Sequence, residues 1–272
     1  MPRAAVEVII PTCGRPAALA ITLTCLAAQS FEDFSVHVSD QTEGDEPLED
    51  PCVQAVVRLL RARGRPVSLS KHLPRRGMAE HRHFLLEQVR APYALSLDDD
   101  VLMEPDLLAR MVRALEEERC GFVGSAVIGL SYQHDERPDE QHIELWHGPV
   151  QPERVTPRSP AWARHKLHNA ANLLHVQRRL GLSAEQQRKY RVAWVGGCVL
   201  YDVDKLRSVG GFSFWPSLPP SHCGEDALAQ LRVMARHGGC GLIPSGAYHL
   251  ELPTTIPDRR VNAPDVLGLD PE

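Results

Sequence analysis

Residues 91–100 read Ala-Pro-Tyr-Ala-Leu-Ser-Leu-Asp-Asp-Asp, an apolar run that stops at three consecutive carboxylates. The run is typical of a buried strand, so the carboxylates would stand together at one edge of a sheet and repel one another. Hard cations such as Mg²⁺ and Mn²⁺ take oxygen ligands and are commonly shared between one or two carboxylates and a substrate phosphate. The triplet therefore indicates nucleotide-linked chemistry. A solvated acidic turn before a helix that starts near Pro105 explains the triplet equally well.

Strands and helices alternate ahead of this run. The sequence predicts strands over residues 6–10, 34–39 and 67–70, and helices over residues 17–28, 53–63 and 78–89. This alternation favours an α/β fold on a mostly parallel sheet, and such sheets bind ligands beyond the carboxyl ends of their strands. Thr12, Asp40 and the acidic triplet each follow a predicted strand, so we expect one site at that edge.

The second half of the chain is less regular. Residues 131–192 are rich in His, Pro, Arg and Gln, with a helix expected within residues 165–182. Strands are expected over residues 192–201 and 240–248, with a helix from Gly224 to Gly238 between them. The apolar stripe of residues 105–118 predicts a helix that packs on the core.

Composition narrows the class of protein. The net charge of -5 and the pI near 6.2 argue against a general nucleic-acid binder. The seven cysteines show no C-x-x-C pair, and their odd number suits reduced thiols in a cytoplasmic protein. No stretch approaches the roughly 18 apolar residues of a membrane span, so we expect no transmembrane segment.

A series of short motifs runs through the chain. They are Ile9-Ile10-Pro11-Thr12 with Arg15-Pro16, Asp40 after a strand, Gly77-x-Ala79-x-x-Arg82, Leu97-Asp98-Asp99-Asp100, Gly196-Gly197, Val209-Gly210-Gly211-Phe212, Gly224-Glu225-Asp226 with Arg232, and His249. With these motifs in this order, the chain resembles the family 2 glycosyltransferases, inverting enzymes of the GT-A fold. The resemblance covers residues 6–249 and lacks the Gln-x-x-Arg-Trp element of the processive relatives, which implies a single-transfer enzyme.

The resemblance implies one GT-A domain in two halves. Residues 1–130 would form the nucleotide-sugar-binding half, with a mostly parallel, Rossmann-like sheet. Residues 131–251 would form the half that binds the acceptor and carries the catalytic base. Residues 252–272, with several prolines, are expected to form an irregular tail.

The resemblance also implies a donor site and a metal site. The residues expected to bind the donor are Pro11, Thr12, Arg15, Asp40, Gly77, Arg82, Asp98 and Asp99. Asp100 would bind the metal directly, and His249 would join it there. Imidazole is a better ligand for Mn²⁺ than for Mg²⁺, so His249 favours manganese, with magnesium as the alternative. Arg82 could instead be a surface arginine that pairs with an acid such as Glu87, and its neighbours His81 and His83 depart from the family's usual Ala-Arg-Asn.

The base of an inverting transfer would be Asp226. The same two acids, Glu225 and Asp226, could also be an acidic helix start without catalytic meaning. The resemblance favours Asp226 as the general base and Glu225 as an acceptor-binding residue. Sugars stack on aromatic rings, so Trp215, in the loop before Asp226, is expected to face the acceptor, whereas Trp162 and Trp194 are expected to anchor the core.

We therefore expect a metal-dependent glycosyltransferase that moves a sugar from a nucleoside diphosphate sugar to a hydroxyl of a glycan, a lipid-linked sugar or a small molecule. A sugar nucleotidyltransferase would need a glycine-rich, lysine-bearing loop after the first strand, and residues 11–16 contain one glycine and no lysine. A protein that kept the fold and binds nucleotide sugars or glycans without turnover is the other rival. The donor base, the donor sugar, the acceptor and the oligomeric state stay open.

Overall fold

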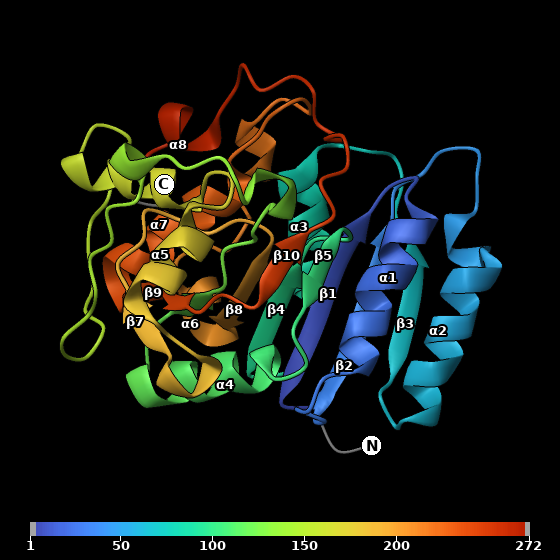
Figure 1. Ribbon diagram of the computed structural model, residues 1–272. Coiled ribbons are helices and arrows are strands. Elements are labelled where there is room, and N and C mark those ends of the chain that lie inside the picture. The colour runs from blue at the N-terminus through green and yellow to red at the C-terminus, as the bar shows by residue number, and fades with distance from the viewer. Residues whose placement is uncertain (1–3, 270–272) are drawn as a thin grey trace.

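The computed structural model describes residues 4–269, in which ten strands form two sheets (Figure 1). The strands are β1 (Val6–Thr12), β2 (Phe34–Asp40), β3 (Val67–Lys71), β4 (Tyr93–Leu97), β5 (Val101–Met103), β6 (Phe122–Gly124), β7 (Arg188–Tyr190), β8 (Cys198–Asp202), β9 (Gly239–Ile243) and β10 (Ala247–His249). The large mixed sheet has the order β3-β2-β1-β4-β8-β6-β9-β7, and β10 pairs with β5 in a second, antiparallel sheet.

Helices cover both faces of the large sheet. The α-helices are α1 (Pro16–Ala27), α2 (Pro51–Ala62), α3 (Met78–Gln88), α4 (Leu107–Glu118), α5 (Asn172–Leu180), α6 (Val203–Ser208), α7 (Glu225–His237) and α8 (Ala263–Val266). Short 3₁₀ helices are η1 (Pro47–Glu49), η2 (Leu130–Tyr132), η3 (Pro138–Glu140), η4 (Pro160–His168), η5 (Ala184–Gln186) and η6 (Trp215–Ser217).

Alternate residues of β1 reach two different cores. Val8 and Ile10 pack with α1, α2 and α4, whereas Ile9 packs on the other face with α3 and α7. Successive side chains of a strand point to opposite faces of its sheet, so a strand buried on both faces reads as one apolar run. This burial explains why the first half of the sequence gave clear strand signals.

The two halves of the chain share the large sheet. Strand β8, from the second half, lies between β4 and β6 and pairs antiparallel with both. The predicted strands of the first half are confirmed within a few residues, and β1, β2 and β4 end where the polar residues begin.

Three predictions of the second half are wrong in their limits. The strand expected over residues 192–201 begins only at Cys198, because Gly197 adopts a φ of 78° that breaks the extended backbone. The strand expected over residues 240–248 divides at Pro244, which has no N–H for the ladder, into β9 and β10. The helix expected within residues 165–182 is split between η4 and α5.

The expected irregular tail is irregular apart from α8, as far as the structure describes it, and its residues 270–272 lie outside the described part. Within residues 4–269, no helix combines the length and the apolar character that crossing a membrane requires.

Candidate active site

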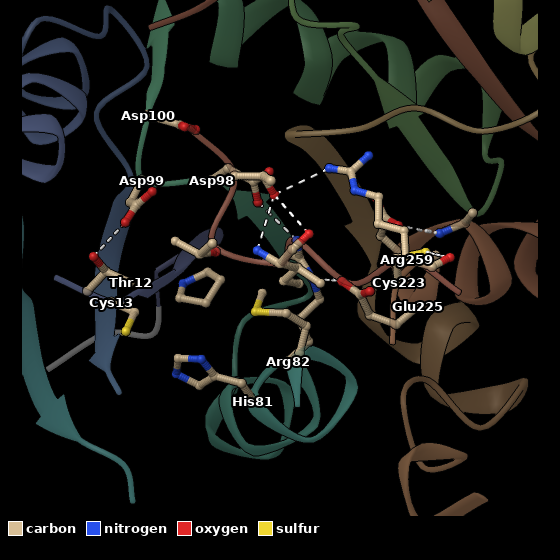
Figure 2. A pocket seen from close by; sticks show the side chains of 18 of the residues that line it. Thr12, Cys13, His81, Arg82, Asp98, Asp99, Asp100, Cys223, Glu225 and Arg259 are labelled. Carbon is tan, nitrogen blue, oxygen red and sulfur yellow. Dashed lines mark hydrogen bonds and ion pairs between the residues drawn. The ribbon is translucent and has the colours of Figure 1, made fainter. Parts of the chain in front are cut away.

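A cavity of about 610 Å³ opens at the carboxyl ends of β1 and β4 (Figure 2). One side is formed by the end of β1 and the acidic triplet. The start of α7, with Glu225, lies across the cavity from Thr12 and Asp99 in Figure 2, and Trp162, Trp194 and the segment 252–262 add further lining residues. The strand-end rule thus places the cavity where the sequence predicts a site.

The acidic triplet is packed into the wall of this cavity. The Thr12 Oγ1 hydroxyl donates to Asp99 Oδ2 at 2.6 Å, and Arg15 Nη1 lies 2.8 Å from Asp100 Oδ2 and 3.3 Å from Asp99 Oδ1. Asp99 and Asp100 are only 6% and 5% exposed. The Asp98 side chain is 38% exposed, but the burial of the other two carboxylates excludes a fully solvated acidic turn as the explanation of the triplet.

Burial also makes these carboxylates costly to ionise. Burial, the largest effect, and the charge of Asp100 raise the pKa of Asp99 to about 6, against the opposing hydrogen bond from Thr12. Burial likewise raises the pKa of Asp100, against the lowering effect of His249 and Arg15. A nearby cation favours the ionised form of these two carboxylates, and Arg15 provides one.

The pairing of β10 with β5 in the second sheet brings Asp100 and His249 close together. His249 pairs with Val101 across β10 and β5, and the Leu250 N–H donates to the Asp100 carbonyl at 2.9 Å. His249 Nε2 lies 3.5 Å from Asp100 Oδ2. One carboxylate and one imidazole at this distance could hold a divalent metal.

The part of the chain that the structure describes contains no larger metal site beside this pair. Among residues 4–269, no three His, Cys, Asp or Glu side chains are grouped so that they could hold a metal by themselves. Two protein ligands leave the remaining positions of a metal for water and for substrate oxygens, as is usual where a cation bridges a protein and a diphosphate.

Arg82 links the two sides of the cavity. Its Nη2 donates to Asp98 Oδ1 at 2.9 Å and its Nε donates to Glu225 Oε1 at 3.0 Å, while Nη1 donates to Ser96 Oγ at 2.7 Å. The residue is 6% exposed, so the reading of Arg82 as a surface arginine paired with Glu87 is wrong. Burial alone would lower the pKa of Arg82, but the surrounding carboxylates outweigh it and raise that pKa.

Asp226 stands in the first turn of α7, on the cavity wall. Gly224 before it has a φ of 74°, and a Cβ there would lie 2.1 Å from Asn262 Oδ1, so only glycine allows this close approach. Burial, the largest effect, and repulsion from Glu225 raise the pKa of Asp226 to about 7, although Arg82 opposes the rise. A carboxyl group with this pKa can accept a proton near neutral pH.

His81 is a cavity residue to which the sequence assigned no role. Its Nε2 lies 2.9 Å from Ser39 Oγ, and burial, the largest effect, lowers its pKa to about 3. His81 is therefore neutral at physiological pH. The departure from Ala-Arg-Asn at residues 81–83 was the signal that could have drawn attention to it.

Two predicted donor residues lie just behind the cavity wall. Asp40 is fully buried, accepts from the Thr42 N–H and hydroxyl, and lies 3.2 Å from Lys71 Nζ, while the next residue, Gln41, lines the cavity. Gly77 precedes Met78, which lines the cavity, and a Cβ at Gly77 would lie 2.5 Å from the His222 ring.

The tryptophans differ from the sequence prediction. Trp162 and Trp194 pack against the core as expected, but both also line the cavity, whereas Trp215 packs against the same core and is absent from the described lining. The other predicted site residues come together around the cavity. They are Pro11, Thr12, Arg15, Arg82, Asp98, Asp99, Asp100, Glu225, Asp226 and His249.

The sequence profile of the family described as "Glycosyl transferase family 2" matches residues 7–178. No curated protein sequence matches the chain.

Solved structures of TarS from S. aureus are similar to this chain. Residues 1–349 of TarS in complex with UDP-GlcNAc share 16% identity and a TM-score of 0.58, with 92% of this chain and 60% of that chain covered. The mannosyltransferase PcManGT from Pyrobaculum calidifontis, in complex with GDP-Man and Mn²⁺, shares 18% identity and a TM-score of 0.51, with 88% of this chain and 56% of that chain covered. At this level of identity the likeness confirms the expected α/β fold of the GT-A type. The chain spans less than two thirds of the length of either structure.

Proposed function

The chain belongs to glycosyl transferase family 2, and on this basis we propose that it transfers a sugar, with inversion, from a nucleoside diphosphate sugar to an acceptor hydroxyl. The observation that carries the proposal is Asp226, a carboxyl group with a pKa of about 7 on the same cavity as the acidic triplet.

The donor would bind along the β1 side of the cavity. Thr12, Arg15, Asp98 and Asp99 line this side, together with Pro11 at the end of β1. Asp40 and Gly77, just behind the wall, would act by fixing Gln41 and Met78, which face the cavity. The structures of TarS with UDP-GlcNAc and of PcManGT with GDP-Man support a nucleotide sugar as the ligand of this fold.

Asp100 and His249 would hold the metal, with Mn²⁺ favoured over Mg²⁺ because imidazole is one of the two ligands. A bound divalent cation would offset the negative charge of the departing nucleoside diphosphate. Arg15, which now pairs with Asp100, has the charge and the reach to contact phosphate oxygens instead.

Asp226 would take the proton from the attacking acceptor hydroxyl. A base with a pKa near the working pH is ionised often enough to act and still basic enough to hold a proton. Glu225 would orient the acceptor while its charge keeps the pKa of Asp226 high. Arg82 bonds to both Asp98 and Glu225, so it would fix the donor side relative to the base. Trp215 as an acceptor residue stays a prediction.

A thermal-shift screen tests the proposal. UDP, GDP and TDP and their sugars are each added with and without Mn²⁺, and a ligand at 100 times its Kd stabilises the native state by about 2.7 kcal/mol. We expect one nucleotide to raise the Tm, with a larger rise when Mn²⁺ is present. Equal shifts with and without metal would contradict the role of Asp100 and His249. No shift with any nucleotide would contradict the proposed function.

A further inference from the structure

Two tryptophans line the cavity that also contains the proposed catalytic base. Trp162 comes from η4 and Trp194 from the loop between β7 and β8, and both line the same cavity as Asp226. Each is half-buried and packs against the core that includes α7. Two aromatic rings are therefore partly open to whatever lies beside Asp226.

Trp194 is fixed relative to α7 by its neighbour in the chain. The Val195 N–H donates to Gln230 Oε1 at 2.8 Å, and Gln230 Nε2 donates to the Val195 carbonyl at 2.7 Å. Gln230 has no exposed surface. Residues 226 and 230 lie on the same face of α7, about 6 Å apart along its axis. The backbone next to Trp194 is thereby fixed to α7, the helix that carries Asp226.

Trp162 is held by ion pairs on its own short helix. Arg164, two residues later, donates twice to the Glu144 carboxylate, at 2.9 and 2.8 Å, and once to Glu153 at 2.8 Å. His165 Nδ1 lies 2.7 Å from the Trp162 carbonyl. A carbonyl only accepts hydrogen bonds, so Nδ1 carries the proton, and in the neutral ring Nε2 is left as an acceptor on a residue that lines the cavity.

The lining around Asp226 combines apolar surface with hydrogen-bond acceptors. Two indole faces offer apolar contact, while His165, Glu225 and Asp226 offer hydrogen-bond acceptors. A pyranose ring presents an apolar C–H face for stacking and hydroxyl groups at its edge for hydrogen bonds. An acyclic polyol or a serine side chain has no such face, and a purely aromatic ligand would offer no hydrogen-bond donors to these acceptors.

We propose that the acceptor is a pyranose sugar that stacks on Trp162 and Trp194 and presents one hydroxyl to Asp226. The inference rests on the proposed transferase function and adds the chemical class of the acceptor. Trp215 is nearer to Asp226 in the sequence, but it does not line the described cavity. We therefore choose Trp162 and Trp194, which do.

The two remaining tryptophans, Trp146 and Trp215, serve as internal controls for a binding experiment. The chain has four tryptophans, of which Trp146 is buried under the Arg191 guanidinium, 3.8 Å from its ring centre, and Trp215 packs on the core. Labelling the whole protein with 5-fluorotryptophan gives one ¹⁹F signal for each, and four single Trp→Phe variants assign them. The labelled protein is titrated with the methyl pyranosides of glucose, galactose, mannose and N-acetylglucosamine, in the presence of UDP and Mn²⁺.

We expect at least one methyl pyranoside to shift the signals of Trp162 and Trp194 saturably and to leave those of Trp146 and Trp215 in place. The inference is overturned if none of these sugars moves the two signals. It is equally overturned if sorbitol or phenol moves them and the sugars do not, or if the signal of Trp215 is the one that responds.

Kinetics separate this inference from the function on which it rests. Trp162→Ala and Trp194→Ala should each raise the acceptor KM about tenfold or more, with the donor KM and the hydrolysis of the donor by water unchanged. The control Trp146→Phe, at a buried ring that does not line the described cavity, should change neither KM, and Trp194→Phe should retain most of the acceptor affinity. Transfer to an acceptor without a pyranose ring would overturn this inference and leave the transferase function standing. Sugar-induced ¹⁹F shifts without any donor turnover would overturn the transferase function instead.

Discussion

Replacing Asp226 by Asn should stabilise the protein and abolish its activity. The pKa of Asp226 rises from 3.8 to about 7, a difference of about 3 that corresponds to about 4 kcal/mol at 1.36 kcal/mol per pKa unit. The partial exposure of Asp226 and its interaction with Glu225 reduce this upper bound, so we expect a gain of about 1–3 kcal/mol from the neutral amide. The Asn carbonyl can still accept the Ala227 N–H, which Asp226 Oδ1 accepts at 2.8 Å.

The gain in stability of the Asp226→Asn variant should depend on pH. Because the folded-state pKa is raised, the folded protein holds this proton more tightly than the unfolded chain does. The cost of ionising Asp226 is thus absent below about pH 4, grows between pH 4 and 7, and is complete above pH 7. The Asn variant should therefore unfold at about the same urea concentration as the wild type at pH 4 and at a higher one at pH 8.

The assay is urea unfolding followed by tryptophan fluorescence at pH 4 and pH 8, combined with turnover at pH 8. Turnover should fall about 10²–10⁴-fold, the usual contribution of a general base, while donor affinity is kept. Asp204→Asn is the matched control, since Asp204 is an exposed acid in the first turn of α6. A variant that loses stability at pH 8, or that keeps its turnover, would refute the reasoning.

Three further predictions follow from other contacts. Arg82→Met leaves the carboxylates of Asp98 and Glu225 without the cation they share, so the free energy of unfolding in urea should fall by about 3–5 kcal/mol. An unchanged urea midpoint would contradict the stabilising role of Arg82 between these two carboxylates. Asp100→Ala, or chelation of the metal by EDTA, should remove the metal-dependent part of donor affinity in calorimetry; the expectation fails if Mn²⁺ strengthens donor binding to the variant as much as to the wild type. Gly224→Ala should cost about 1–3 kcal/mol, measured in urea, because of the φ of 74° and the contact with Asn262, whereas Gly44→Ala, at a φ of 77° with no atom within 4 Å, should cost less.

The strands of the first half could be predicted because β1 and β4 are mostly buried and apolar, while β2 alternates apolar and polar residues. These patterns gave the limits of the three strands within a few residues. The three-residue strand β5 was missed, because it is too short for a periodic signal and its partner, β10, lies in a distant part of the sequence. Gly197 and Pro244 moved the limits of later strands in ways that hydrophobicity alone does not report.

The site was predictable to the extent that it follows strand ends. That rule gathered Thr12 and the acidic triplet, and the resemblance added Asp226 and His249. The bridge from Arg82 to Glu225 could not be predicted, because it joins residues 143 positions apart and depends on how α3 and α7 pack. The tryptophans of the site could not be predicted for a similar reason. Proximity in the sequence favoured Trp215, whereas the fold brings Trp162 and Trp194 to the cavity.

The anomeric configuration of the sugar released by water tests the central claim most directly, because this reaction needs no knowledge of the acceptor. The donor found in the thermal-shift screen is incubated with the protein and Mn²⁺, and ¹H NMR records the released sugar before it mutarotates. The account predicts an initial anomer opposite to that of the donor, and no release with EDTA or with Asp226→Asn. Release with the donor's own configuration, or at an unchanged rate from Asp226→Asn, would contradict it.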